Sequence, residues 1–161
     1  LFSSFKKFAL SSEYDYVFLD CPSDLDAVSA NALNAAEYCI VPCFADRFSK
    51  SGLVNVVTAI EKAAENGCGT EISLLGILLC NFRSMTKTAK RNLEEISSAI
   101  PEATFQTVIR QSAAIPDSIE ICKPVSCLPK SPASEDFEKL TTEFLVRTNK
   151  IAQITKLASG K

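Results

Sequence analysis

Short runs of apolar residues, each closed by a polar or turn-forming residue, recur along the chain. These runs predict strands at 16–19, 38–42, 72–80, 105–109 and 125–128. Apolar and polar positions alternate little within them, which is typical of strands buried on both faces in a parallel sheet. The run at 72–80 is the longest, so we expect it to be the central strand.

Between these runs, apolar residues recur at intervals of three and four, the period of an amphipathic helix. The spacing predicts helices over 1–10, 28–36, 51–66, 86–99, 116–122 and 133–157. Strands that alternate with helices in this way predict a three-layer α/β fold with a doubly wound, mostly parallel sheet. A length of 161 residues without an internal repeat predicts a single domain over residues 1–161.

The first apolar run ends at Asp20 and is followed by Cys21 and Pro22. The carboxyl ends of parallel strands are where open α/β sheets bind ligands, and a carboxylate is a ligand that Mg²⁺ prefers. Asp20 is therefore a candidate magnesium ligand. The same residues also fit an Asp that caps the loop after an ordinary strand.

Composition narrows the class of protein. Apolar residues make up 47% of the chain, which excludes a disordered protein. No apolar stretch approaches the roughly 18 residues of a membrane span, and the amino end has no signal-peptide pattern, so we expect a cytoplasmic protein. The seven cysteines lie mostly in apolar runs and are expected to be reduced core residues. With no histidine and no Cys-x-x-Cys pair, a cysteine metal site is not expected.

The net charge of −2 is unevenly distributed. Residues 1–82 carry 5 Lys and Arg against 10 Asp and Glu, whereas residues 83–161 carry 12 against 9. Basic side chains of the second half are candidates for sequence-independent contacts with DNA phosphates, although each also fits a solvated helix face. These residues are Lys87, Lys90, Arg91, Arg110, Lys123 and Lys130, followed by Lys139, Arg147, Lys150 and Lys156.

Several motifs together resemble one family. The stretch 20–53 contains Asp-Cys-Pro-Ser, then Asn-Ala-Leu-Asn-Ala-Ala-Glu, then a strand ending in Pro42, then Asp46 and Gly-Leu. Leu-Gly-Ile-Leu-Leu at 75–79, Thr-Val-Ile-Arg at 107–110, Lys-Pro-Val at 123–125 and Pro-Lys-Ser-Pro-Ala-Ser-Glu-Asp-Phe at 129–137 follow in the same order. This series resembles the ParA/Soj partition ATPases, relatives of MinD. One departure is Gln111, where the family usually carries a second Arg among its candidate DNA contacts.

The resemblance implies a P-loop NTPase-like fold of the ParA/MinD type, with this chain as the carboxyl-terminal part of a longer domain that is incomplete at its amino end. In that frame Asp20 looks like the Walker B carboxylate, which holds Mg²⁺ directly or through water. Pro22 and Ser23 would lie in the adjoining switch-like loop, and Asn81 resembles a residue that contacts the nucleotide base. The resemblance also implies ATP and Mg²⁺ as cofactors, a homodimer, a ParB-like partner and non-specific binding to double-stranded DNA at the nucleoid.

The phosphate-binding loop of this class does not occur in these 161 residues. The five glycines are Gly52, Gly67, Gly69, Gly76 and Gly160, and no pair of them precedes Lys-Ser or Lys-Thr. ATP hydrolysis is thus expected of a full-length parent protein. Two alternatives stay open: a non-catalytic remnant that acts as an interaction or DNA-binding module, and a MinD-like positioning ATPase. A membrane partner is not expected, because the last helix has only a weakly apolar face.

Overall fold

The structure is a computed structural model that describes residues 14–22, 27–44, 57, 58, 60, 72–83 and 85–158. The chain divides into two compact units, residues 1–39 with 50–74 and residues 40–49 with 75–161. The predicted helix at 1–10 and most of the one at 51–66 lie outside the described residues, as do Ser23, Asp46 and Gly52.

In the first unit, helix α2 spans Ala27–Leu33 and confirms the helix predicted at 28–36, although it ends earlier. Its alanine-rich sequence has high helix propensity, and it buries Ser29 and Ala32. The amide nitrogen of Asn31 donates a hydrogen bond to the carbonyl oxygen of Ala27 at 2.8 Å. This bond links successive turns of the helix.

The buried strand predicted at 16–19 is wrong for this structure. These residues have no regular secondary structure, and the side chain of Phe18 is 73% exposed. A strand forms only when a neighbouring strand satisfies its backbone groups. Among the described residues, the sheet contains β1 and β2, and residues 16–19 are not part of it. The apolar composition of residues 16–19 indicates a tendency to be buried, but it does not indicate whether a neighbouring strand is present.

The second unit contains most of both strands, β1 (Tyr38–Phe44) and β2 (Ser73–Cys80), which are neighbours in one sheet. Both strands were predicted, and β1 extends two residues beyond the predicted Pro42. Residues 103–111 pair in parallel with β2 through isolated bridges, Ile77 with Thr104 and Phe82 with Arg110. Since β1 and residues 103–111 both pair with it, β2 has the central position predicted for residues 72–80.

Residues 105–109, predicted to be a strand, do not form a continuous one. The two bridges are five residues apart from Ile77 to Phe82 and six apart from Thr104 to Arg110, so the partner segment has one more residue between them. Between the bridges, the backbone N–H groups of Gln106 and Thr107 donate to the carboxylate of Glu143, each at 2.9 Å. A side chain from a helix therefore replaces part of the backbone ladder.

Three helices belong to the second unit: α4 (Lys87–Ala99), α5 (Ala114–Glu120) and α6 (Pro132–Ala158). They confirm the helices predicted at 86–99, 116–122 and 133–157, with small shifts of the ends. The strand predicted at 125–128 is wrong, because Val125–Cys127 form the 3₁₀ helix η2. The N–H of Cys127 bonds to the carbonyl of Pro124, and that of Leu128 to Val125, so local turns satisfy this short run.

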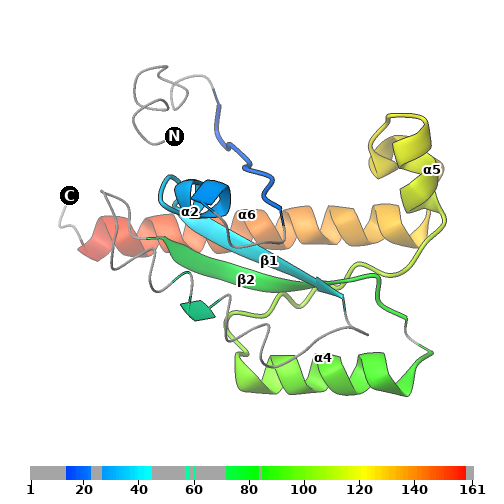
Figure 1. Ribbon diagram of the computed structural model, residues 1–161, viewed down its shortest axis with the longest axis horizontal. Coiled ribbons are helices and arrows are strands. Elements are labelled where there is room, and N and C mark those ends of the chain that lie inside the picture. Colours follow the sequence, from blue (N-terminus) through cyan, green and yellow to red (C-terminus); the bar gives the residue numbers. More distant parts are fainter. Residues whose placement is uncertain are drawn as a thin grey trace. The chain divides into compact units, whose positions relative to one another are not determined.

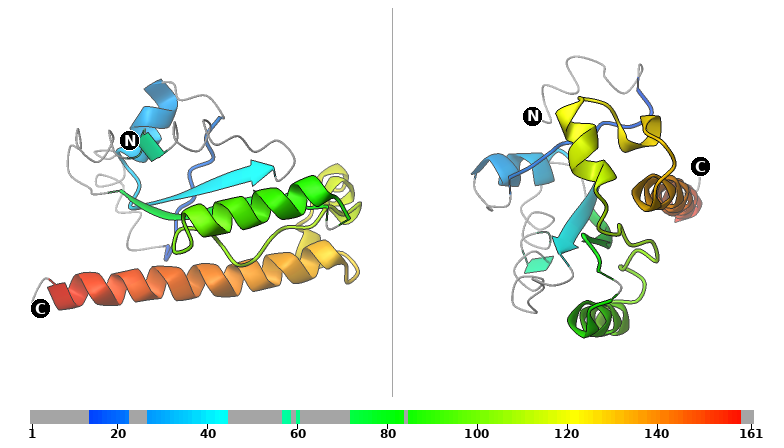
Figure 2. Two further views of the ribbon diagram at one scale, coloured as in Figure 1. Left: turned by 90° about the horizontal axis from the view of Figure 1, so that it is seen from below. Right: turned by 90° about the vertical axis from the view of Figure 1, so that its right-hand side faces the viewer.

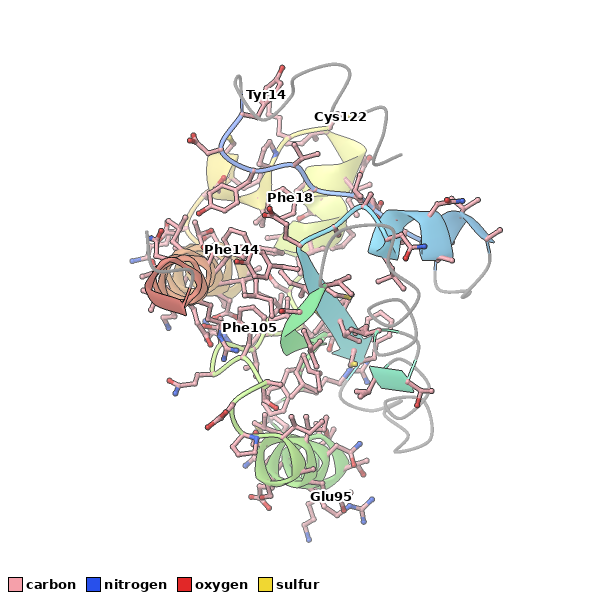
Figure 3. The ribbon with its side chains drawn as sticks, turned by 90° about the vertical axis from the view of Figure 1, so that its left-hand side faces the viewer. Tyr14, Phe18, Glu95, Phe105, Cys122 and Phe144 are labelled. Carbon is pink, nitrogen blue, oxygen red and sulfur yellow. The ribbon has the colours of Figure 1, made fainter. Side chains whose placement is uncertain are left out.

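Within this unit, α4 and α6 lie on opposite faces of the paired strands (Figure 1 and Figure 2). The largest fully buried side chains are Phe105, Ile77, Leu79 and Ile96, which come from the paired strands and from α4. Figure 3 shows Phe105 on the side of the strands that α6 covers, whereas Glu95 projects from the outer face of α4. The helix–sheet–helix arrangement confirms the predicted three-layer α/β class.

Candidate functional site

Asn81 stands at the carboxyl end of β2, one residue beyond the strand. Its φ of 53° lies in the left-handed region, which Asn tolerates better than most residues because its short side chain bonds locally. The pairing with the neighbouring segment continues past Asn81, because Phe82 forms a parallel bridge with Arg110. Asn81 is therefore at the edge where parallel α/β sheets bind ligands, and its contact with a nucleotide base stays a prediction.

Arg110 marks the same edge on the neighbouring segment. Its Nε donates to Oδ2 of Asp136 at 2.8 Å, and its Nη2 donates to Oδ1 at 2.7 Å, which makes the pair bidentate. The backbone N–H of Arg110 also donates to Oδ2 of Asp136, at 3.0 Å. Nη2 donates a further bond to the carbonyl of Pro132 at 3.0 Å. The guanidinium predicted to contact DNA is thus bound to the first turns of α6.

This pair shifts the titration of both groups. Asp136 is 4% exposed, and burial acts to raise its pKa. The hydrogen bonds and the charge of Arg110 outweigh burial, so the pKa of Asp136 lies below its ordinary value. The hydrogen bond with Asp136 likewise raises the pKa of Arg110. Both groups are therefore charged at neutral pH.

Lys130 and Glu135 extend the charged cluster outward from Arg110. The Glu135 carboxylate lies 3.6 Å from Nη2 of Arg110 and 3.5 Å from Nζ of Lys130. Lys130 is 81% exposed, and Lys123 also lies on the surface. An exposed pair of this kind adds little stability, so the ammonium of Lys130 can exchange Glu135 for another anion at small cost.

The basic residues predicted on α4 form one exposed stripe. Lys87, Lys90 and Arg91 are separated by three and four positions, which places them on one side of the helix. Arg91 lies 3.9 Å from Glu95, and its side chain is 69% exposed. Exposed cations at this spacing suit contacts with successive phosphates of a polyanion. Their role in DNA binding stays a prediction.

Asp20 and Pro22 are exposed residues of the first unit, in a stretch without regular secondary structure. Ser23 lies outside the described residues. Asn81 belongs to the second unit. The assignment of Asp20 to a magnesium site therefore rests on the sequence.

Two charged residues of α6 are engaged inside the fold. Nη1 of Arg147 donates to the carbonyls of Leu75 and Glu102 at 3.0 and 3.1 Å, and Nη2 donates to that of Thr104. Arg147 also pairs with Glu143 at 2.9 Å and covers the ring of Phe105, 4.3 Å from its centroid. Arg147 was predicted as a DNA contact, and its internal bonds contradict that. The Glu-x-x-x-Arg spacing was the signal that could have indicated the pair.

The cysteines do not form a buried set. Of the six cysteines in the part of the chain that the structure describes, Cys21, Cys122 and Cys127 are exposed and Cys39, Cys43 and Cys80 are half-buried, and none of the six is in a disulfide. Burial, followed by the nearby Cys43, raises the pKa of Cys80 to about 11, which disfavours a reactive thiolate. Within the described ranges, His, Cys, Asp and Glu side chains do not gather into a group of three or more that could hold a metal ion. No helix in the same ranges is long and apolar enough to cross a membrane.

Comparison with known proteins identifies the group of relatives. A family model described as an AAA domain matches residues 4–74. The chain is 27% identical over 139 residues to the chromosome partitioning protein ParA of Myxococcus xanthus, covering 86% of this chain and 49% of that protein. It is 28% identical over 135 residues to the chromosome-partitioning ATPase Soj of Thermus thermophilus, covering 83% and 54%. The chain is a relative of the ParA/Soj partition ATPases.

A third relative agrees with this result. This chain is 30% identical over 137 residues to a ParA family protein of Chlamydia muridarum, and the match covers 84% of this chain and 52% of that protein. It spans about half the length of the curated relatives it matches. The resemblance predicted from its motifs is confirmed, and so is the α/β class that the family implies.

Proposed function

We propose that this ParA/Soj relative is part of an ATPase that segregates plasmids or chromosomes. In this proposal the parent protein dimerises around ATP and Mg²⁺ and binds double-stranded DNA without sequence preference in that state. A ParB-like partner stimulates hydrolysis, and the protein acts in the cytoplasm at the nucleoid. The similarity to proteins named ParA and Soj over more than four fifths of the chain carries the proposal.

Two residues, each considered within its own unit, have the chemistry that a magnesium ion and a nucleotide base require. Asp20 offers a hard oxygen ligand of the type that Mg²⁺ prefers, and its exposed carboxylate is accessible to the ion or its water. Asn81 lies at the ligand-binding edge of β2, where its amide suits a nucleotide base. Pro22 and Ser23 would shape the loop beside Asp20. The phosphates need a glycine-rich loop, a pattern that the five glycines of this sequence do not form, and in this proposal a longer parent protein supplies it.

ATP supplies a γ-phosphate whose presence favours one dimer arrangement and whose loss releases it. This chain would respond at the carboxyl edge of its sheet, where Asn81 follows β2 and Arg110 forms a bridge with Phe82. Lys87, Lys90 and Arg91 would supply the phosphate contacts with DNA, because they form an exposed stripe on α4. Contacts of this kind depend on charge and carry no sequence information.

The proposal is tested on the full-length parent protein by light scattering and by DNA retention, each with ATP and with ADP. We expect dimers and retained DNA with ATP only. Replacing Lys87, Lys90 and Arg91 together by alanine should weaken DNA binding and leave dimerisation unchanged. The slope of log K for DNA binding against log salt concentration should become less steep by about 0.9 for each phosphate contact that is lost. Ser98→Ala, an exposed change on the same helix, is the control.

DNA retention that is equal with ATP, with ADP and without nucleotide would contradict the ATPase proposal. It would favour the non-catalytic DNA-binding module, since binding would then depend on the basic surface alone. Absence of retention in every nucleotide state would contradict the DNA-binding part and leave an interaction module.

A further inference from the structure

The Arg110–Asp136 pair connects the end of a paired segment to a helix that begins more than twenty residues later. Arg110 is the residue whose bridge with Phe82 closes the pairing of residues 103–111 with β2. Asp136 lies in the second turn of α6. The pair therefore fixes where α6 starts relative to the carboxyl edge of the sheet.

Arg110 and Asp136 are joined by several hydrogen bonds. The Asp136 carboxylate accepts bonds from Nε, Nη2 and the backbone N–H of Arg110. Nη2 is also held by the carbonyl of Pro132, the first residue of α6. An unpaired charge at the 4% exposed Asp136 would be strongly destabilising. A contact between Arg110 and an exposed DNA phosphate would stabilise the protein by less than the loss of the Asp136 pair would cost, because water and salt screen the phosphate charge.

We propose that Arg110 and Asp136 form a positioning pair that holds the first turns of α6 against the carboxyl edge of the sheet, and that Arg110 is not a DNA contact. This inference rests on the proposed function for its consequence on DNA binding. The pair sets the path of the loop from Gln111 to Ala113, whose first residue donates its backbone N–H to the carbonyl of Phe82. It also sets the place of Lys130, through Glu135.

A positioning role and a phosphate contact predict different behaviour for conservative variants. Arg110→Lys keeps the positive charge and so keeps a phosphate contact, but it loses the bidentate fork. Asp136→Asn keeps the shape of the side chain but removes the charge that holds Arg110. If Arg110 only held Asp136, both variants and the double variant would show the same defect. If Arg110 contacted DNA, the lysine variant would bind normally and Asp136→Asn would free the guanidinium for tighter binding.

The test uses the full-length parent protein with Arg110→Lys, Asp136→Asn, the double variant, and Glu138→Gln as an exposed control on the same helix. Hydrogen exchange is measured for peptides covering 103–113 and 131–140. In the three pair variants we expect exchange in both peptides to be about tenfold faster, since a bond to a charged group contributes about that factor. The peptide covering α4 and the Glu138→Gln protein should be unchanged.

DNA affinity is measured for the same proteins with ATP at several salt concentrations. We expect equal losses of affinity in the single and double variants, with the same smaller salt slope in all three, because each variant displaces Lys130 through Glu135. Normal exchange in the variants, or tighter DNA binding by Asp136→Asn, would overturn the proposal. If the unmodified protein fails to bind DNA at all, the proposed function is wrong, while the exchange measurement still decides whether the pair positions α6.

Discussion

Replacing Arg147 by methionine should lower the free energy of unfolding by about 3 kcal/mol, the lower end of the range for breaking a buried ion pair. Methionine keeps most of the apolar stem but removes the guanidinium. The change leaves Glu143 without its partner and deprives the carbonyls of Leu75, Glu102 and Thr104 of a donor. Both charged side chains are 18% exposed, which places the effect at the lower end.

Urea unfolding of the chain, followed by circular dichroism, measures this loss. Arg91→Met is the matched control, because Arg91 also pairs with a glutamate four residues away but is 69% exposed. We expect it to change stability by no more than about 0.5 kcal/mol. Equal effects of the two substitutions would show that the contacts of Arg147 with the paired segments add nothing to the fold.

Replacing Gly76 by valine should destabilise the chain by about 3 kcal/mol, the upper part of the range for overpacking a core. A Cβ at this position would lie 2.6 Å from Cε2 and 2.7 Å from Cδ2 of Phe105, and 3.1 Å from Nη1 of Arg147. Phe105 is 1% exposed, so its ring cannot move away from the new side chain without disturbing the core around it. The small residue is needed here because the ring and the guanidinium pack directly on the backbone of β2.

Thermal unfolding of Gly76→Val, of Phe105→Leu and of the double variant shows whether the clash with the Phe105 ring causes the loss of stability. If the clash with the ring causes the loss, the double variant will be more stable than the sum of the single effects predicts. Strict additivity would mean that the valine acts elsewhere, for example on the strand backbone. The proximity of Gly76 and Phe105 would then have no energetic consequence.

Most helices and both strands of the second unit were predictable, because their sequences carry strong local signals. Residues 73–80 form a nearly continuous apolar run, and α4 repeats apolar residues with a clear helical period. Residues 105–109 were predicted less well. Their break comes from the Glu143 carboxylate, which lies thirty-six residues after Thr107, and no local pattern contains that contact. The strand predicted at 16–19 was wrong for a related reason, because strand pairing depends on a neighbour that is distant in the sequence.

The candidate site shows the same limit. Sequence patterns correctly placed Asn81 at the end of a strand and Lys87, Lys90 and Arg91 on an exposed helix face. They gave Arg110 and Arg147 as candidates for DNA phosphate contacts, because composition gives a charge but not its partner. The structure gives both side chains internal carboxylates, Asp136 and Glu143. Which basic residues remain available to a polyanion is thus decided by tertiary contacts.

The Mg²⁺ dependence of ATP hydrolysis by the full-length parent protein tests most directly the proposal that Asp20 serves a magnesium nucleotide. Asp20→Ala should raise the Mg²⁺ concentration needed for half-maximal hydrolysis by about 10- to 100-fold, the range for residues that hold or orient a metal. Asp15→Ala, an exposed carboxylate of the same segment, should leave it unchanged. A normal Mg²⁺ dependence in Asp20→Ala, or equal effects of the two substitutions, would contradict the claim.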